Sequence, residues 1–120
     1  YTEDVLSSYK GIYLSTADDL LRLNRSDAAR LFLDKAAEID NEDYSVLKGY
    51  ADVALTEGNC EEAAANFEKI STMDQYSTIG FLGLEKTFGE CFGDENKAME
   101  YKNKALNKQK ESKQENFDEL

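Results

Sequence analysis

Carboxylates, with 25 Asp and Glu side chains, are the most abundant potentially catalytic groups in this sequence of 120 residues. It has no histidine, so the usual Ser-His-Asp or Cys-His triad cannot form. Carboxylate pairs such as Glu61 and Glu62 occur in any acidic helical protein, and nothing in the sequence buries this pair in a cleft. Gly80 and Gly83 are not followed by the Gly-Lys-Ser/Thr that completes a phosphate-binding loop. The sequence therefore predicts no catalytic residues, and we expect that this chain is not an enzyme.

The two cysteines, Cys60 and Cys91, are the remaining reactive side chains. Without histidine they do not supply the four ligands of a structural zinc site. Both fall near predicted turns between helices. Neighbouring turns of a helical stack lie about 10 Å apart, beyond the ~7 Å Cα separation that a disulfide allows. We therefore expect two separate thiols, and the sequence predicts neither a metal site nor a cofactor.

The charge of the chain excludes several classes of partner. Fourteen basic and 25 acidic side chains give a formal net charge of −11. Such a charge repels the phosphates of nucleic acids and the surface of anionic membranes. No apolar run approaches the ~20 residues that span a bilayer, so membrane insertion is not expected. The charge is typical of a soluble protein, and it would also attract a basic partner.

The composition of the chain predicts that it is built from helices. The chain has no proline, and its alanine, leucine, glutamate and lysine content favours helices. Gly58 and Asn59, followed by Glu62, are typical of a helix C-cap and a capping box. Gly93-Asp94 and Asn24-Arg25-Ser26 give similar turn signals. The predicted helices span about residues 10–22, 27–39, 44–57, 60–72, 78–91 and 95–110.

A repeat of 34 or 35 residues relates these helices in pairs. The matching positions include Tyr13, Leu47 and Phe81; Leu20, Ala54 and Phe88; Ala29, Ala63 and Ala98; Leu33 and Phe67; and Ala36, Ile70 and Ala105. One residue is added before Ala98, where the spacing is 35. A period of this length is typical of stacked helical arrays, in which each unit buries its apolar face against its neighbours.

The repeat resembles the tetratricopeptide family, in which an aromatic residue, small residues and a second aromatic recur over two helices. The middle unit matches best, through Leu47, Tyr50-Ala51, Ala54, Ala63, Phe67 and Ile70. The resemblance implies an all-α, right-handed superhelical stack of antiparallel helix pairs, an α-solenoid. Its units would be residues 10–43, 44–77 and 78–112, between an N-terminal lead-in of residues 1–9 and a polar tail of residues 113–120.

The sequence departs from the family pattern at several positions. Asn41 and Gln75 stand where the family has proline, and Glu85 stands where it has a small residue. Lys102 replaces the packing aromatic of the third unit, a role that we expect Tyr101 to take.

The resemblance also implies a binding surface, because the first helices of such units line a concave groove that binds peptides. The groove positions are Leu14, Asp18, Leu21, Lys48, Asp52, Leu55, Ile79, Leu82 and Lys86. Lys48 and Lys86 alone do not make the carboxylate clamp by which some family members hold chaperone tails. A mixed apolar and charged groove favours an amphipathic helix or an apolar peptide.

The leading hypothesis is therefore an adaptor or scaffold that binds a protein or peptide partner, basic or amphipathic in character. Two alternatives stay open: a structural or self-associating segment of a larger assembly protein, and a non-catalytic part of an enzyme or secretory-pathway cochaperone. The chain starts at Tyr1, which indicates a processed product or a fragment, so the compartment stays open between cytoplasm and bacterial periplasm. Phe117-Asp118-Glu119-Leu120 resembles an endoplasmic-reticulum retrieval tail and would place the chain in that lumen.

Overall fold

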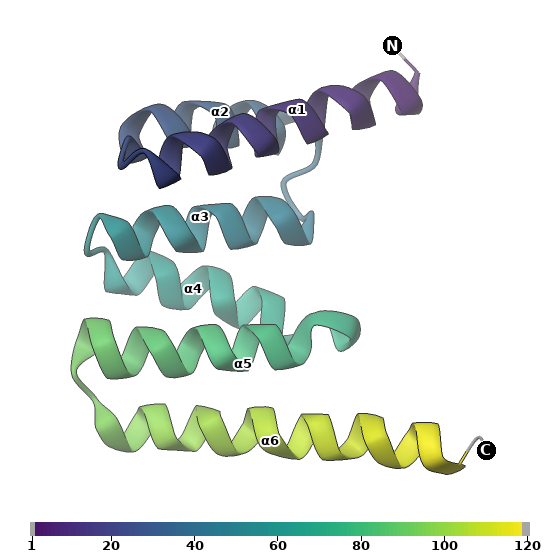
Figure 1. Cartoon of the computed structure of the whole chain (residues 1–120), viewed down its shortest axis with the longest axis vertical. Helices are drawn as coiled ribbons and strands as arrows, with labels where there is room; N and C mark the ends of the chain where they lie inside the picture. Colours follow the sequence, from purple (N-terminus) through teal and green to yellow (C-terminus); the bar gives the residue numbers. More distant parts are fainter. Residues whose placement is uncertain (1, 119–120) are drawn as a thin grey trace.

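The computed structural model describes the backbone of residues 2–118 and the side chains of residues 2–113. Every element is helical, and no strand occurs within residues 2–118. The helices are stacked in sequence order, from α1 at one end of the molecule to α6 at the other (Figure 1). Their bounds are α1 Glu3–Arg22, α2 Ser26–Ile39, α3 Tyr44–Thr56, α4 Cys60–Ser71, η1 Asp74–Tyr76, α5 Ser77–Lys86, η2 Thr87–Phe92 and α6 Glu95–Asp118.

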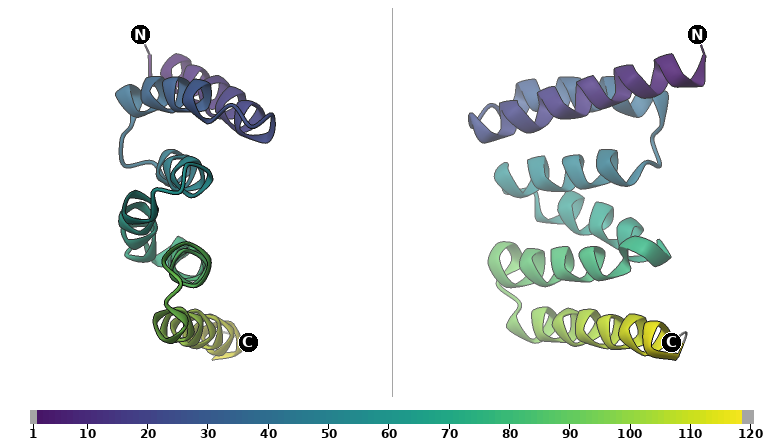
Figure 2. Two further views of the ribbon diagram at one scale, coloured as in Figure 1. Left: turned by 90° about the vertical axis from the view of Figure 1, so that its left-hand side faces the viewer. Right: turned by 45° about the vertical axis from the view of Figure 1, so that its right-hand side comes forward.

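Helices that are adjacent in the sequence pack in pairs. α1 packs against α2, α3 against α4 and α5 against α6, and the two helices of each pair run in opposite directions (Figure 2). Further contacts join α2 to α3 and α4 to α5, so the pairs form one continuous stack. The predicted all-α fold of adjacent helix pairs is confirmed.

The core follows the columns of the sequence repeat. The buried residues at these columns are Leu47, Ala54, Ala29 and Ala63, Leu33 and Phe67, and Ala36, Ile70 and Ala105. One core cluster joins α1, α2 and α3 around Leu33 and Val53. A second joins α3, α4 and α5 around Phe67 and Leu84. Each cluster spans two helix pairs, so no pair buries its apolar face alone.

Tyr101 takes the aromatic position of the third unit, as expected. Its ring centroid lies 6.4 Å from that of Phe81 and 5.5 Å from that of Phe88. Lys102, the neighbouring residue, is exposed. Tyr101, one residue before Lys102, thus supplies the aromatic packing of the last helix pair.

The turns within the three helix pairs share one backbone conformation. Asn24, Gly58 and Gly93 have left-handed φ angles of 61°, 75° and 73°. A left-handed residue after a helix lets the next N–H reach back to a helix carbonyl. These bonds run from Arg25 N–H to Leu20 O (2.8 Å), from Asn59 N–H to Ala54 O (2.8 Å) and from Asp94 N–H to Phe88 O (2.7 Å). The turns predicted at these positions are confirmed.

The two terminal helices are longer than predicted. α1 begins at Glu3 rather than near residue 10, so most of the expected lead-in is helical. Thr2 caps this helix, because its Oγ1 accepts a hydrogen bond of 3.3 Å from the Val5 N–H. α6 continues to Asp118, through most of the expected tail. The side chains of the tail Phe117–Leu120 lie outside the described residues.

The extra residue of the third unit is taken up by a π turn. η2 is π-helical and continues α5 without a break. A π turn holds one residue more than an α turn, so it absorbs a single insertion. The spacing of 35 between Ala63 and Ala98 therefore has a local origin in residues 87–92.

The expectation of two separate thiols is wrong, because Cys60 and Cys91 form a disulfide with a Cα–Cα distance of 5.6 Å. The expected separation assumed helices in ordinary contact. Here Gly80 and Gly83 bring α5 unusually close to α4, since a Cβ at either position would collide with Ser71 or Phe67. The bond joins the start of α4 to η2 and so ties the second helix pair to the third.

Candidate binding site

A hollow of about 200 Å³ lies between α1 and α3. Its apolar lining includes Leu14, Ala17, Leu21, Leu33 and Val53. Its polar lining includes Asp18, Ser45, Lys48 and Asp52. Sites for cofactors and drug-sized ligands usually measure about 300–1,000 Å³. This hollow is smaller, and its size suits a single side chain of a larger partner.

The hollow follows from the spacing of small and apolar residues on two helices. On α1 its lining residues are spaced three or four apart, which places them on one side of the helix. On α3 the lining includes Gly49, where a Cβ would collide with Leu33. Because Gly49 has no side chain, α3 packs directly on Leu33, and the hollow between α1 and α3 is left unfilled.

The charged rim of the hollow is only partly neutralised. Lys48 Nζ donates to both carboxylate oxygens of Asp52, at 2.9 and 2.7 Å. Asp18 pairs with Arg22 at 2.7 Å, but the two side chains are 58% and 74% exposed. An exposed pair of this kind contributes at most about 1 kcal/mol. Asp18 can therefore exchange Arg22 for a cation of a ligand at little cost.

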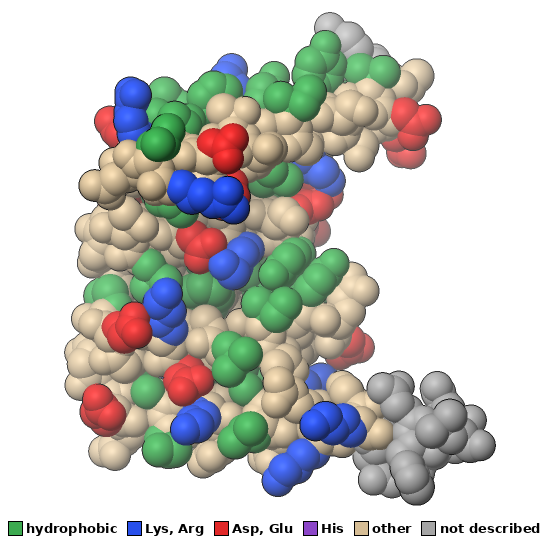
Figure 3. Space-filling view, viewed as in Figure 1, with side chains coloured by type: hydrophobic (Ala, Val, Ile, Leu, Met, Phe, Trp, Pro, Cys, Tyr) green, Lys and Arg blue, Asp and Glu red, His purple; other side chains and the backbone are tan. Residues whose placement is uncertain are grey.

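The predicted groove residues do not all meet at this hollow. It brings together Leu14, Asp18, Leu21, Lys48 and Asp52. Leu55 and Lys86 line a second hollow beside the disulfide, together with Glu90. Ile79 and Leu82 are 38% and 44% exposed on α5. In Figure 3, on the face where α1, α3 and α5 lie nearest the reader, acidic and basic side chains alternate over α1 and α3.

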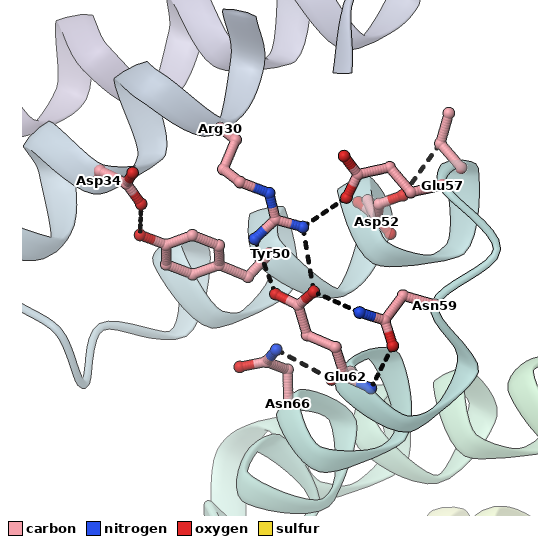
Figure 4. Close-up of polar contacts among 9 residues, drawn as sticks. Arg30, Asp34, Tyr50, Asp52, Glu57, Asn59, Glu62 and Asn66 are labelled. Atoms are coloured by element: carbon pink, nitrogen blue, oxygen red, sulfur yellow. Dashed lines mark hydrogen bonds and ion pairs between the residues drawn. The ribbon is translucent and has the colours of Figure 1, made fainter. Parts of the chain in front are cut away.

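A polar cluster at the junction of the first two helix pairs was not predicted. Arg30 of α2 donates to both carboxylate oxygens of Glu62 on α4, at 2.8 and 3.0 Å, and to Glu57 after α3 (Figure 4). These hydrogen bonds raise the pKa of the Arg30 guanidinium, so it stays charged. The Tyr50 hydroxyl donates to Asp34 at 2.5 Å, and burial, with this bond, raises the pKa of Tyr50. The cluster crosslinks α2 to α3 and α4.

A second ion pair ties α1 to the start of α3. Lys10 Nζ donates to Asp43 at 2.9 Å, and this bond raises the pKa of Lys10. Burial alone would raise the pKa of Asp43. The bonds from Lys10 and from the N–H groups of Ser45 and Val46 outweigh burial, so the pKa of Asp43 is lowered. Asp43 thus caps α3 and links it to α1.

In comparisons with family models, curated proteins and solved structures, no match to this chain was found. The tetratricopeptide resemblance therefore rests on the repeat columns alone. Among the described residues, no helix is long and apolar enough to cross a membrane. Nor do the described side chains include a group of three or more His, Cys, Asp or Glu that could hold a metal ion.

Proposed function

We propose that this chain is a protein-interaction module of the tetratricopeptide type, a right-handed stack that binds a segment of another protein across α1 and α3. The hollow supports the proposal, because five of the groove residues that the family resemblance implies, Leu14, Asp18, Leu21, Lys48 and Asp52, line it together. Its volume of about 200 Å³ and its apolar floor favour an anchoring side chain over a cofactor.

The rim favours a basic residue next to that anchor. Asp18 is held only by an exposed ion pair, and the chain as a whole carries a net charge of −11. A partner helix or peptide with one leucine-sized or aromatic residue and a neighbouring lysine or arginine would satisfy both features. Two acidic residues in the same place would be repelled.

The test is selection of peptides from a random library on the immobilised chain, followed by NMR titration of the selected sequence. We expect an apolar residue beside a basic one, with amide shifts concentrated at Ala17, Leu21 and Gly49. Asp18→Lys should weaken binding about tenfold, which corresponds to about 1.4 kcal/mol. Glu68→Lys makes the same charge change at an exposed site on α4 and should leave affinity unchanged. Shifts centred elsewhere, or equal losses in both variants, would contradict the proposal.

The disulfide bears on the compartment in which this function operates. Disulfides persist in oxidising compartments and are rare in the cytosol. Cys60 and Cys91 are the only cysteines of the chain, and they are bonded to each other. This pairing favours the bacterial periplasm or the secretory pathway over the cytoplasm.

A further inference from the structure

The N-terminal end of the stack exposes a helix face that is buried in the following pair. Val46 and Val53 of α3 are 0% and 1% exposed, and Val53 packs with Leu33 of α2. The equivalent residues of α1, 34 positions earlier, are Ile12 and Asp19, and both are exposed. Ile12 is 58% exposed. The face of α1 that would pack against a preceding helix is therefore open in this chain.

The C-terminal end exposes the complementary face. In the α4–α5 junction, Ser71 of α4 lies against Gly80 of α5. The residue of α6 equivalent to Ser71, 35 positions later, is Leu106, which is 45% exposed. Met99 of α6 is 54% exposed, whereas the equivalent Ala64 of α4 is 8% exposed. The two ends of the stack are thus the two halves of one kind of junction.

We propose that copies of this chain associate head to tail, with α6 of one copy packing antiparallel against α1 of the next. The alignment along the helices is that of α4 against α5, so Leu106 of one copy lies opposite Ile12 of its neighbour as Ser71 lies opposite Gly80. Because Ile12 and Leu106 carry large side chains where that junction has glycine and serine, α6 and α1 would lie farther apart than α4 and α5 do. This association does not depend on the peptide-binding function proposed above, because it uses neither the hollow nor its rim.

The charge distribution selects a second copy as the occupant of these faces. Residues 1–94 carry eight basic and nineteen acidic side chains, a net charge of −11. α6 as a whole, residues 95–118, carries six lysines and five acidic side chains, a net charge of +1, and all six lysines lie between residues 97 and 113. Lys102, Lys110 and Lys113 follow the three- and four-residue spacing of Met99 and Leu106, so they lie on the same face of α6. This basic face finds its complement on the acidic remainder of an identical chain, which favours head-to-tail over head-to-head contact.

The lengths of the terminal helices fit the same arrangement. α1 and α6 have 20 and 24 residues, against 10 to 14 in α2 to α5. Their extra turns project on the same side of the stack (Figure 1). In the proposed register these turns lie alongside each other, and Glu3 and Asp4 of one copy come within about one helical turn of Lys110 and Lys113 of the other. The extensions would lengthen the interface and add ion pairs to it.

A head-to-tail contact uses two different surfaces, so it does not stop at a dimer unless a ring closes. We expect the average mass in sedimentation experiments to rise steadily from micromolar to millimolar concentration. The association should weaken as salt is added, because exposed charges contribute to it. A monomer throughout this range at low salt would overturn the proposal.

Two variants with a single damaged end test the polarity of the contact. Ile12→Glu damages the α1 face and Leu106→Glu the α6 face, and each alone should lower self-association at least tenfold. Mixed in equal amounts, they should form a dimer and nothing larger, because each supplies the intact end that the other lacks. No dimer in the mixture, or full association of either variant alone, would refute head-to-tail packing.

Charge reversal gives an independent version of this test. Lys110→Glu with Lys113→Glu should abolish association, and a partner carrying Glu3→Lys with Asp4→Lys should restore it. Leu31→Glu is the matched control, since Leu31 is 64% exposed on α2 and its equivalent Ala65 is exposed within the stack. This control should associate like the unchanged chain, and a loss equal to that of Ile12→Glu would contradict the assignment of the interface. Circular dichroism checks that every variant keeps its helicity.

Discussion

Breaking the Cys60–Cys91 bond is the perturbation whose cost follows most directly from the structure. The bond joins residues separated by 31 positions. Loop-closure entropy for a crosslink of this span stabilises the folded chain by about 3.7 kcal/mol at 25 °C. An unfolding entropy of about 2.1 cal/mol/K per residue makes 1 kcal/mol equivalent to roughly 4 °C in a chain of this length. We therefore expect the double variant Cys60→Ser, Cys91→Ser to melt about 15 °C below the oxidised chain.

The assay is thermal unfolding followed by circular dichroism and calorimetry. The unchanged chain in a reducing agent should melt close to the double variant, and adding the reducing agent to the variant should change nothing. Thiol titration under denaturing, non-reducing conditions should find no free thiol in the unchanged chain. Two free thiols, or equal melting temperatures for oxidised and reduced chains, would refute the assignment of the bond and of the close α4–α5 approach behind it.

Hydrogen exchange locates the effect within the stack. The bond ties α4 to η2, so its loss should expose amides of α5 and η2 before those of α1 and α2. Uniform loss of protection along the chain would show instead that the stack unfolds as a single unit.

Four further substitutions test the close approach of the helices and the ion pairs between them. Gly80→Ala should lower the free energy of unfolding in urea by about 3 kcal/mol, because the new Cβ meets the backbone of Ser71. Gly11→Ala, with nothing within 4 Å of its Cβ, should raise that free energy by about 1 kcal/mol. A change of the same sign in both variants would contradict this difference in packing. Asp43→Asn should lose the ion pair with Lys10 but keep the α3 cap. The pKa of Asp43 in the folded chain lies below its usual 3.8. The difference in unfolding free energy between the unchanged chain and Asp43→Asn should therefore be constant above pH 3.8 and disappear as the pH falls through the lowered pKa. A difference that persists in acid would show that the ion pair with Lys10 is not its cause. Arg30→Met should cost about 2 kcal/mol in the same unfolding assay by leaving two carboxylates without their shared donor, and a neutral result would show that the cluster does not stabilise the junction.

Much of the fold was determined by the sequence alone, because helix formation and turns depend on neighbouring residues. The repeat columns placed Leu33 and Phe67 in the core, and the left-handed turns at Gly58 and Gly93 were expected from local signals. Thr2 is also a residue type that commonly caps helices, so the early start of α1 could have been predicted from the sequence but was not. Five residues of the hollow, Leu14 and Asp52 among them, were expected from the resemblance to the tetratricopeptide family, which assigns them to the first helices of two units.

Tertiary structure alone decided how far apart the helices lie. Periodicity reports which side of a helix faces the core, but the separation depends on side-chain volumes on both partners at once. Gly80 and Gly83 close the α4–α5 distance until Cys60 reaches Cys91, and no pattern within one helix predicts that contact. The same holds for the Arg30 cluster, because Arg30, Glu57 and Glu62 come from three segments of the chain. Whether Leu55 shared a site with Leu14 was likewise set by the stacking of the pairs, which put these two residues in separate hollows.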